Sequence, residues 1–144
     1  MDLRTALDTN ILSVLLGSPG AVHTVAVRLG KAKLDGTLYV SPFVYTEILA
    51  YPKITPSFLS EFLESTGVVV DLTVQNNVWL EAGLRYALYS RRRRKSDSKE
   101  KPRRIASDFL IGAHALLHAD RLMTLDVGFY QTNYPELNLI PVHA

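Results

Sequence analysis

The chain has 144 residues, a net charge of +2 and no cysteine, which excludes disulfides, thiolate nucleophiles and cysteine-ligated zinc. Its N-terminus has no basic region followed by an apolar stretch, and no apolar run approaches the ~20 residues that cross a bilayer. We therefore expect one domain over residues 1–144, soluble in the cytoplasm and not associated with a membrane.

The charge is distributed unevenly along the chain. Residues 91–104 hold nine of the sixteen Lys and Arg residues and two of the fourteen Asp and Glu residues. This segment therefore carries +7, and the rest of the chain carries −5. Its composition predicts a helix end followed by a loop. A basic arm on an acidic body suits a polyanionic partner, although a solvated loop would give the same pattern.

Short apolar runs alternate with segments of helical periodicity along the chain. In chain order the predicted elements are strand Thr5–Leu7, helix Thr9–Leu16, helix Val22–Leu34, strand Thr37–Val40, helix Pro42–Ala50, a helix from Pro56, strand Val68–Val70, a long helix from Thr73 through Tyr89, helix Ser107–Ala119, strand Leu122–Leu125 and strand Leu137–Ile140. Strands separated by helices indicate an α/β fold, in which a parallel sheet is covered on both faces.

Several of these elements carry local signals at their boundaries or along one face. Ser41 is predicted as the N-cap of the helix that begins at Pro42, and Thr55-Pro56 is expected to open another helix. Gly67 is expected to end the helix before Val68–Val70, and that strand is expected to be buried. Trp79 is predicted to pack in the core because it shares a helical spacing with apolar neighbours.

Four carboxylates stand in otherwise apolar surroundings. Asp8 follows the first predicted strand and Asp126 follows the fourth, so both are expected on the rim where ligands bind to parallel sheets. Asp108 begins an apolar helix, and Glu47 lies in a helix whose other residues look buried. If these side chains meet, their like charges favour a bound divalent cation, which could orient a phosphate and activate water.

Each carboxylate also has a purely structural interpretation. Asp8 could cap the helix that follows it, and Asp126 could cap the turn before Phe129. Asp108 would suit the first turn of a helix capped by Ser107, because the helix dipole favours negative charge there. Glu47 could pair with an arginine, since an unpaired buried carboxylate is costly.

Other catalytic patterns find little support. The sequence contains no Walker A motif, GxGxxG, HExxH or GxSxG, and Asp8-Thr9-Asn10 lacks the second aspartate of an aspartyl-phosphate phosphatase. His114 and His118 lie four residues apart, as metal ligands on a helix can, but no third ligand is evident nearby. We interpret His114 as an interior histidine with a hydrogen-bond partner.

Four segments resemble, in order, the four motifs of the PIN domain family: Leu7–Leu12, Ser41–Ile48, Ile105–Ala115 and Thr124–Tyr130. The resemblance extends over nearly the whole chain and departs from the family pattern in the long basic insert before Asp108. It implies a three-layer α/β/α sandwich around a central, mainly parallel sheet of about five strands.

The resemblance also implies a site. The catalytic and metal-binding residues would be Asp8, Glu47, Asp108 and Asp126, with Mg²⁺ or Mn²⁺ as cofactor. Glu47 would bind metal or hold the attacking water. Three residues would lie at the edge of the site, namely Thr9, Asn10 and Thr124. Independently of the resemblance, the basic run Arg91, Arg92, Arg93 and Arg94 could contact the phosphate backbone of RNA. A solvated helix end or a dock for an acidic antitoxin tail would give the same run.

The function implied by the resemblance is metal-dependent endoribonucleolytic hydrolysis of RNA phosphodiester bonds. PIN domains of this length resemble VapC-type toxins of type II toxin–antitoxin pairs, which implies a homodimer and a cognate VapB-like antitoxin as partners. Three alternatives stay open: an RNA-processing nuclease outside such a pair, a non-catalytic RNA-binding protein that keeps the fold, and a phosphatase.

Overall fold

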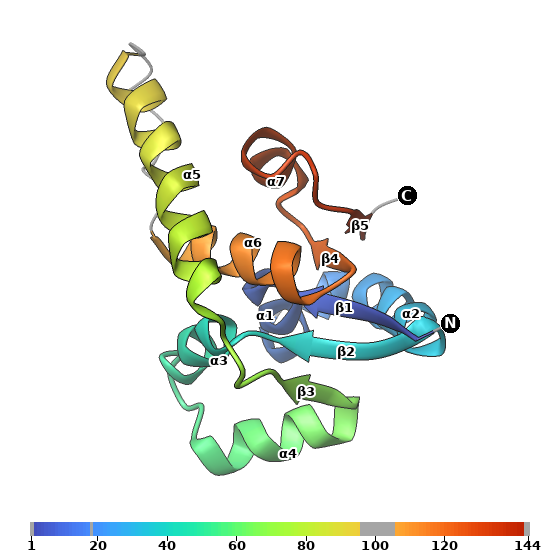
Figure 1. The fold of residues 1–144 in the computed structure, drawn as a ribbon. Coiled ribbons are helices and arrows are strands. Elements are labelled where there is room, and N and C mark those ends of the chain that lie inside the picture. Colours follow the sequence, from blue (N-terminus) through green and yellow to red (C-terminus); the bar gives the residue numbers. More distant parts are fainter. Residues whose placement is uncertain (1, 18, 96–105, 143–144) are drawn as a thin grey trace.

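The computed structural model describes residues 2–17, 19–95 and 106–142 of the chain (Figure 1). Its strands are β1 (Leu3–Leu7), β2 (Gly36–Val40), β3 (Val68–Val70), β4 (Arg121–Thr124) and β5 (Leu139–Pro141). They form one sheet in the order β3-β2-β1-β4-β5, and all four neighbouring pairs are parallel. This confirms the predicted parallel sheet of five strands.

The described helices are α1 (Thr9–Gly17), α2 (Pro19–Asp35), α3 (Pro42–Leu49), α4 (Pro56–Thr66), α5 (Asn76–Lys95), α6 (Ala106–His118) and α7 (Val127–Asn133). In the part of the chain that the structure describes, none of these helices is both long enough and apolar enough to cross a membrane.

The central strands separate two apolar cores. Successive side chains of a strand point to opposite faces of the sheet. In β1, Leu7 packs in a core with side chains of α1, α2, α3 and α4, whereas Ala6 packs with side chains of α5, α6 and α7. Met123 and Leu122 of β4 divide between the same two cores. The sheet therefore has helices on both faces, which confirms the three-layer sandwich (Figure 1).

The predicted capping signals lie at helix ends. Ser41 Oγ accepts a hydrogen bond from the Val44 N–H at 3.2 Å, and Thr55 Oγ1 accepts one from the Phe58 N–H at 3.1 Å. Gly67 ends α4 in the left-handed conformation with φ of 74°, which glycine adopts at little cost. The helices α3 and α4 therefore begin directly after Ser41 and Thr55, as the sequence predicted.

Two predictions about burial are wrong. Trp79 is 52% exposed, because α5 packs through Val78 and Ala82 and the next position on the helix faces outward. Phe43 contacts its ring edge-on, at a centroid distance of 5.3 Å. The strand Val68–Val70 is only partly buried, with Val69 48% exposed, because β3 is the edge strand of the sheet.

Some element boundaries also differ from the prediction, and one helix was not predicted. The long helix begins at Asn76 rather than Thr73, because Asp71 accepts the Thr73 N–H in a turn. Ser107 lies inside α6, which begins at Ala106 among the described residues. The helix α7 was not predicted, since its seven residues are too few to show a periodic pattern.

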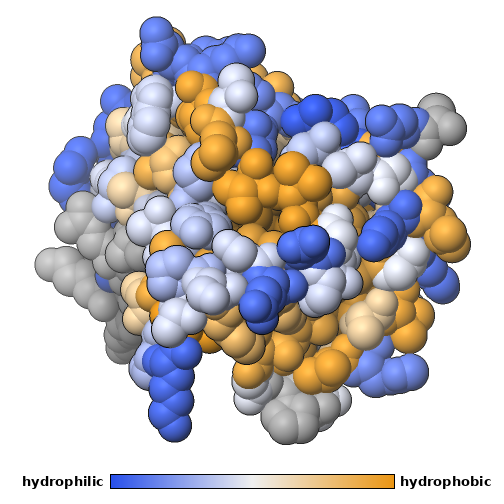
Figure 2. All heavy atoms as spheres, turned by 90° about the horizontal axis from the view of Figure 1, so that it is seen from below, coloured by the Kyte–Doolittle hydropathy of each residue, from blue (hydrophilic) through white to orange (hydrophobic). Residues whose placement is uncertain are grey.

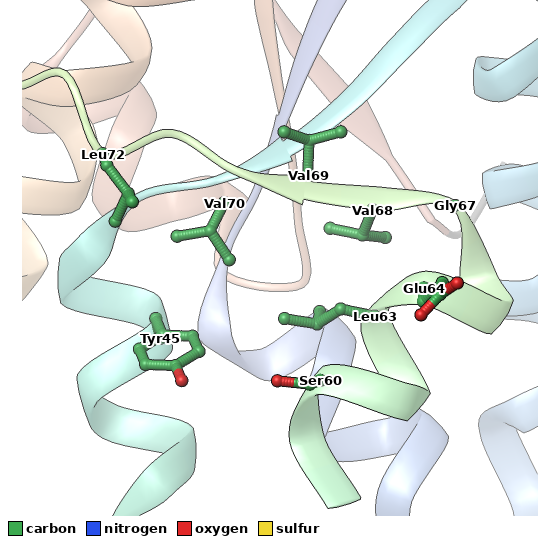
Figure 3. A pocket seen from close by; sticks show the side chains of 9 residues that line it. All are labelled: Tyr45, Ser60, Leu63, Glu64, Gly67, Val68, Val69, Val70 and Leu72. Atoms are coloured by element: carbon green, nitrogen blue, oxygen red, sulfur yellow. The ribbon is translucent and has the colours of Figure 1, made fainter. Parts of the chain in front are cut away.

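A hollow of about 620 Å³ lies beneath β3, between this strand and α4 (Figure 3). Val68 and Val70 point into it, and Val69 points away. Its lining is mostly apolar, with Glu64 as the one charged side chain. Figure 2 shows hydrophobic side chains gathered on this side of the molecule. The hollow lacks the grouped carboxylates that the sequence singled out.

Candidate functional site

The two aspartates that follow strands meet at one rim of the sheet. β1 and β4 are neighbours, with Leu7 opposite Met123, and the Asp8 N–H donates to the Met123 carbonyl at 3.0 Å. The Thr124 hydroxyl donates to Asp8 Oδ2 at 2.8 Å. The same hydroxyl oxygen accepts the Asp126 N–H at 2.9 Å. Thr124 therefore links Asp8 directly to the backbone of Asp126.

Asp8 is a buried carboxylate held by hydrogen-bond donors. Its Oδ1 accepts the Thr9 N–H at 2.7 Å, and its Oδ2 also accepts the Asn10 amide at 3.3 Å and the Tyr130 hydroxyl at 3.1 Å. Burial raises the pKa of Asp8 to about 6. The charge of Asp108 also raises this pKa, against the lowering effect of the hydrogen bonds.

Asn10 fixes the start of α1 against the end of β4. Its side-chain oxygen accepts the Leu125 N–H at 3.1 Å, while its amide nitrogen donates toward Asp8 and, at 3.5 Å, toward Thr124. Because one amide contacts both strand ends, the Asp8 side chain has little freedom to turn.

Glu47 lies between the beginnings of two helices. Its Oε1 accepts the Thr9 hydroxyl at 2.7 Å, and its Oε2 accepts the Ser107 hydroxyl at 3.4 Å. Thr9 is next to Asp8 and Ser107 is next to Asp108, so Glu47 is tied to the surroundings of both aspartates. In the part of the chain that the structure describes, these hydroxyl groups, and not an arginine, are the partners of the Glu47 carboxylate.

Asp108 and Asp126 act on the same buried hydroxyl. The pKa of Tyr130 is raised well above its ordinary value, chiefly by burial and by Asp8, and further by the charges of Asp108 and Asp126. Asp126 lies at the N-cap position of α7, but its side chain makes no capping hydrogen bond. The capping interpretation of Asp126 is therefore wrong, and the charge of its carboxylate acts on Tyr130 beside Asp8.

A comparison with protein families matches residues 5–133 to the model of the PIN domain. The chain belongs to the PIN domain family.

Several solved structures are similar to this PIN domain. VapBC2 from Rickettsia felis, bound to a DNA fragment from its promoter, has 18% identity and a TM-score of 0.65, covering 96% of this chain and 98% of that one. VapBC-1 from nontypeable Haemophilus influenzae has 22% identity and a TM-score of 0.65, covering 99% and 100%. FitAcB from Neisseria gonorrhoeae has 20% identity and a TM-score of 0.58, covering 97% and 99%. At these identities the likeness shows the fold. A comparison with curated proteins gives no match.

The chemistry of the PIN rim fits a hard divalent cation. All four acidic side chains offer oxygen ligands, and burial, together with the charge of Asp108, disfavours the ionised form of Asp8 unless a cation is present. Among the described residues, no three acidic or histidine side chains are close enough to enclose an ion by themselves. A bound ion would therefore keep part of its shell for water or substrate, as Mg²⁺ usually does.

The basic run lies at the end of α5, which projects beyond the rest of the PIN domain (Figure 1). Arg91, Arg92 and Arg94 are exposed, and Arg93 is half-buried. Residues 96–104, the rest of the basic segment, lie outside the described residues. Further down the same helix, Tyr86 and Tyr89 pack on Phe109, with ring centroids 4.9 and 5.4 Å apart. Since a helix rises ~1.5 Å per residue, the run begins only a few ångströms beyond the contact with the α6 turn that carries Asp108.

Sequence reasoning missed two contributors to the PIN site. Ser107 was interpreted as a cap, but its hydroxyl donates to Glu47. Tyr130 was noted only as the last residue of the fourth motif, but its hydroxyl donates to Asp8. Neither contact has a sequence signal, because each joins residues that are far apart in the chain.

Proposed function

We propose that this PIN domain is a metal-dependent endoribonuclease and the toxin of a type II toxin–antitoxin pair. One observation carries the catalytic part of the proposal. Thr124 joins Asp8 to the backbone of Asp126, and Glu47 accepts the hydroxyls of Thr9 and Ser107, the neighbours of Asp8 and Asp108. The charges of Asp108 and Asp126 also reach the Tyr130 hydroxyl that contacts Asp8. Such a group of carboxylates suits binding of Mg²⁺ or Mn²⁺ next to a phosphate.

In this proposal Asp8, Asp108 and Asp126 would be the ligands of the cation, directly or through the water molecules that it keeps. When bound, the cation would neutralise the carboxylates and supply an activated water for attack on the phosphodiester. Glu47 is already oriented by two hydroxyl groups. It would bind metal or hold the attacking water and accept its proton.

The other polar residues of the rim support these carboxylates. Thr9, Asn10 and Thr124 form the edge of the site and keep Asp8 in place. The exposed arginines of the run Arg91–Arg94 would contact the phosphate backbone of RNA outside the site. Such contacts add affinity without sequence specificity.

The toxin role is supported by the names of the structures that share the fold. They are VapBC and FitAB assemblies, two of which are bound to DNA fragments. By this likeness, the proposal includes a small VapB-like antitoxin as partner, a homodimer and a cytoplasmic location. Co-expression of a small gene from the same operon should restore growth to cells that the protein arrests, and its product should co-purify with the protein.

The catalytic proposal is tested with purified protein, total RNA and MnCl₂ or MgCl₂, with and without EDTA, followed by mapping of new RNA ends. We expect cleavage that EDTA abolishes. Asp8→Asn and Asp108→Asn should each lower the rate at least ~100-fold, since metal-assisted stabilisation is worth several kcal/mol. Glu61→Gln, an exposed carboxylate of α4, is the matched control and should cleave normally.

The same variants also test whether loss of activity reflects loss of the fold. With its pKa raised from 3.8 to about 6, ionised Asp8 costs the metal-free protein about 3 kcal/mol at pH 7. Asp8→Asn should therefore melt no lower than the wild type in EDTA. Full activity of both aspartate variants would refute the proposal. RNA binding that EDTA does not weaken, together with no cleavage in MnCl₂, would support the non-catalytic alternative.

A further inference from the structure

The two oxygens of the Asp8 carboxylate have different surroundings. Oδ2 accepts three donors, from Thr124 at 2.8 Å, Tyr130 at 3.1 Å and Asn10 at 3.3 Å. Among the described residues, Oδ1 accepts a single donor, the Thr9 N–H, at 2.7 Å. A carboxylate has about four lone-pair sites, two on each oxygen. Oδ2 is therefore fully used inside the protein, and Oδ1 keeps capacity for a further ligand.

Tyr130 differs from the other donors to Oδ2. Thr124 and Asn10 belong to the strand end and the helix start that form the rim, whereas Tyr130 comes from α7, four residues after Asp126. Its side chain is 1% exposed. Phe129 packs against its ring edge-on at 4.9 Å, and the ring of Tyr134 lies 6.3 Å away. A ring packed in this way holds its hydroxyl in one place.

The segment that carries Tyr130 is anchored to the neighbouring helices. Directly after α7, the Tyr134 hydroxyl donates to the Phe109 carbonyl at 2.5 Å, next to Asp108. Arg85 of α5 donates to the Asn133 carbonyl at 2.8 Å. These two contacts anchor the segment after Tyr130 to two different helices, and the rings of Phe129 and Tyr134 pack around Tyr130 itself. The place of the Tyr130 hydroxyl therefore does not depend on any one of these contacts.

We propose that Tyr130 is a positioning residue, which holds Asp8 by Oδ2 so that Oδ1 remains available to a divalent cation. The inference rests on the proposed function, in which Asp8 is a metal ligand. Donors that orient metal-binding carboxylates typically contribute ~10- to 100-fold to metal affinity or activity. Loss of the Tyr130 hydroxyl should therefore weaken the response to metal while the fold is kept.

The test replaces Tyr130 by phenylalanine, which fills the same space and lacks only the hydroxyl. Two readouts are followed as MnCl₂ is titrated: the rise in melting temperature of the protein alone, and the rate of RNA cleavage. For Tyr130→Phe we expect both midpoints to move to ~10-fold higher MnCl₂. Cleavage at saturating MnCl₂ should stay within a few-fold of the wild-type rate.

Tyr134→Phe is the matched control, because it removes a buried tyrosine hydroxyl that binds a backbone carbonyl rather than a carboxylate. It should lower the melting temperature without moving the MnCl₂ midpoint. Melting in EDTA shows that each variant is folded before titration.

The outcomes separate this inference from the proposed function. A Tyr130→Phe protein with the wild-type MnCl₂ midpoint would overturn the role of Tyr130 and leave the nuclease proposal intact. A shift of equal size in Tyr134→Phe would also overturn it, because the effect would then be general loosening of α7. A wild-type protein that neither cleaves RNA nor responds to MnCl₂ would overturn both.

Discussion

Two largely buried aspartates of this protein have opposite electrostatic surroundings. Burial opposes ionisation of both. Asp71 receives a hydrogen bond from His114 at 2.9 Å and lies 3.7 Å from Arg4, and its pKa ends below the ordinary value. Among the described residues, Asp8 has neutral donors and the nearby charge of Asp108, and burial raises its pKa to about 6. Asp71 thus has a partner of opposite charge within the fold and Asp8 has another acid beside it, which supports the proposal that Asp8 binds an external cation.

The histidine that partners Asp71 predicts how stability depends on pH. His114 is 1% exposed, as the sequence predicted for an interior histidine, and its ring stacks on His118 with centroids 5.2 Å apart. Burial lowers the pKa of His114, Asp71 raises it, and the charges of His118 and Arg4 lower it further. The folded state therefore binds a proton at His114 less readily than the unfolded chain does.

The sign of the effect follows from linkage. Between the lowered folded pKa of His114 and its unfolded value of 6.5, the unfolded chain binds more protons, so stability falls as pH falls. Asp71 acts in the same direction below its unfolded pKa of 3.8. His114→Gln, with an amide that can still donate to Asp71, should lose about 1–3 kcal/mol at pH 7 and show a smaller decline between pH 7 and 5.

Urea unfolding at both pH values, in EDTA, measures this difference. His23→Gln, an exposed histidine of α2, is the control and should keep the wild-type pH dependence. An unchanged decline in His114→Gln would show that other groups cause the acid sensitivity.

At the scale of elements, local signals predicted helix ends better than helix faces. Ser41, Thr55 and Gly67 act through neighbours within four residues, so their roles could be predicted from the sequence. Trp79 and Val69 could not be placed, because exposure there depends on which helix covers which part of the sheet. The order of the strands in the sheet decides which helix covers which part of it, and the periodicity of the sequence does not indicate that order.

The candidate site, too, could be predicted from the sequence only in part. Asp8 and Asp126 were predicted at one rim because the carboxyl ends of parallel strands must lie together. The contacts of Glu47 with Ser107, and of Asp8 with Tyr130, depend on how α3, α6 and α7 pack. Those contacts join residues 60 and 122 positions apart, and no local pattern indicates them.

Packing between α6 and the segment after α7 gives a prediction of its own. Gly112 of α6 lies against the Tyr134 ring, and a Cβ there would be 2.4 Å from the ring carbon Cε2. Gly112→Ala should therefore force the ring to move and destabilise the protein by about 1–3 kcal/mol. Gly83→Ala is the matched control, because a Cβ on that exposed position of α5 meets nothing within 4 Å.

In the control, alanine should stabilise the helix by up to about 1 kcal/mol. Urea midpoints of the two variants should thus move in opposite directions. Equal stabilisation in both would mean that Tyr134 does not press on Gly112 in solution, and that α7 is held by other contacts.

At the scale of the whole molecule, the charge of this PIN domain is divided between an acidic body and a basic segment. The net charge of +2 combines +7 in residues 91–104 with −5 elsewhere. The described part of that segment ends α5, beyond the contact of Tyr89 with Phe109. An RNA strand that reaches the carboxylate rim would be repelled by the body and attracted by this end of α5.

Arg91 and Arg94 are the side chains with which to test that attraction. Both are exposed, whereas Arg92 also binds Asn133 at 2.6 Å, so its removal would disturb α7 as well. The double variant Arg91→Ala, Arg94→Ala should bind RNA more weakly regardless of sequence. The plot of log affinity against log salt should become shallower by about 0.7 for each lost contact to single-stranded RNA. Cleavage positions should not change, because phosphate contacts do not read bases.

The control is the double variant Lys31→Ala, Lys53→Ala, which removes two exposed charges from the body and should leave the salt dependence of RNA binding as it was. If the slope is unchanged in the arginine variant, Arg91 and Arg94 face solvent and do not contact the RNA.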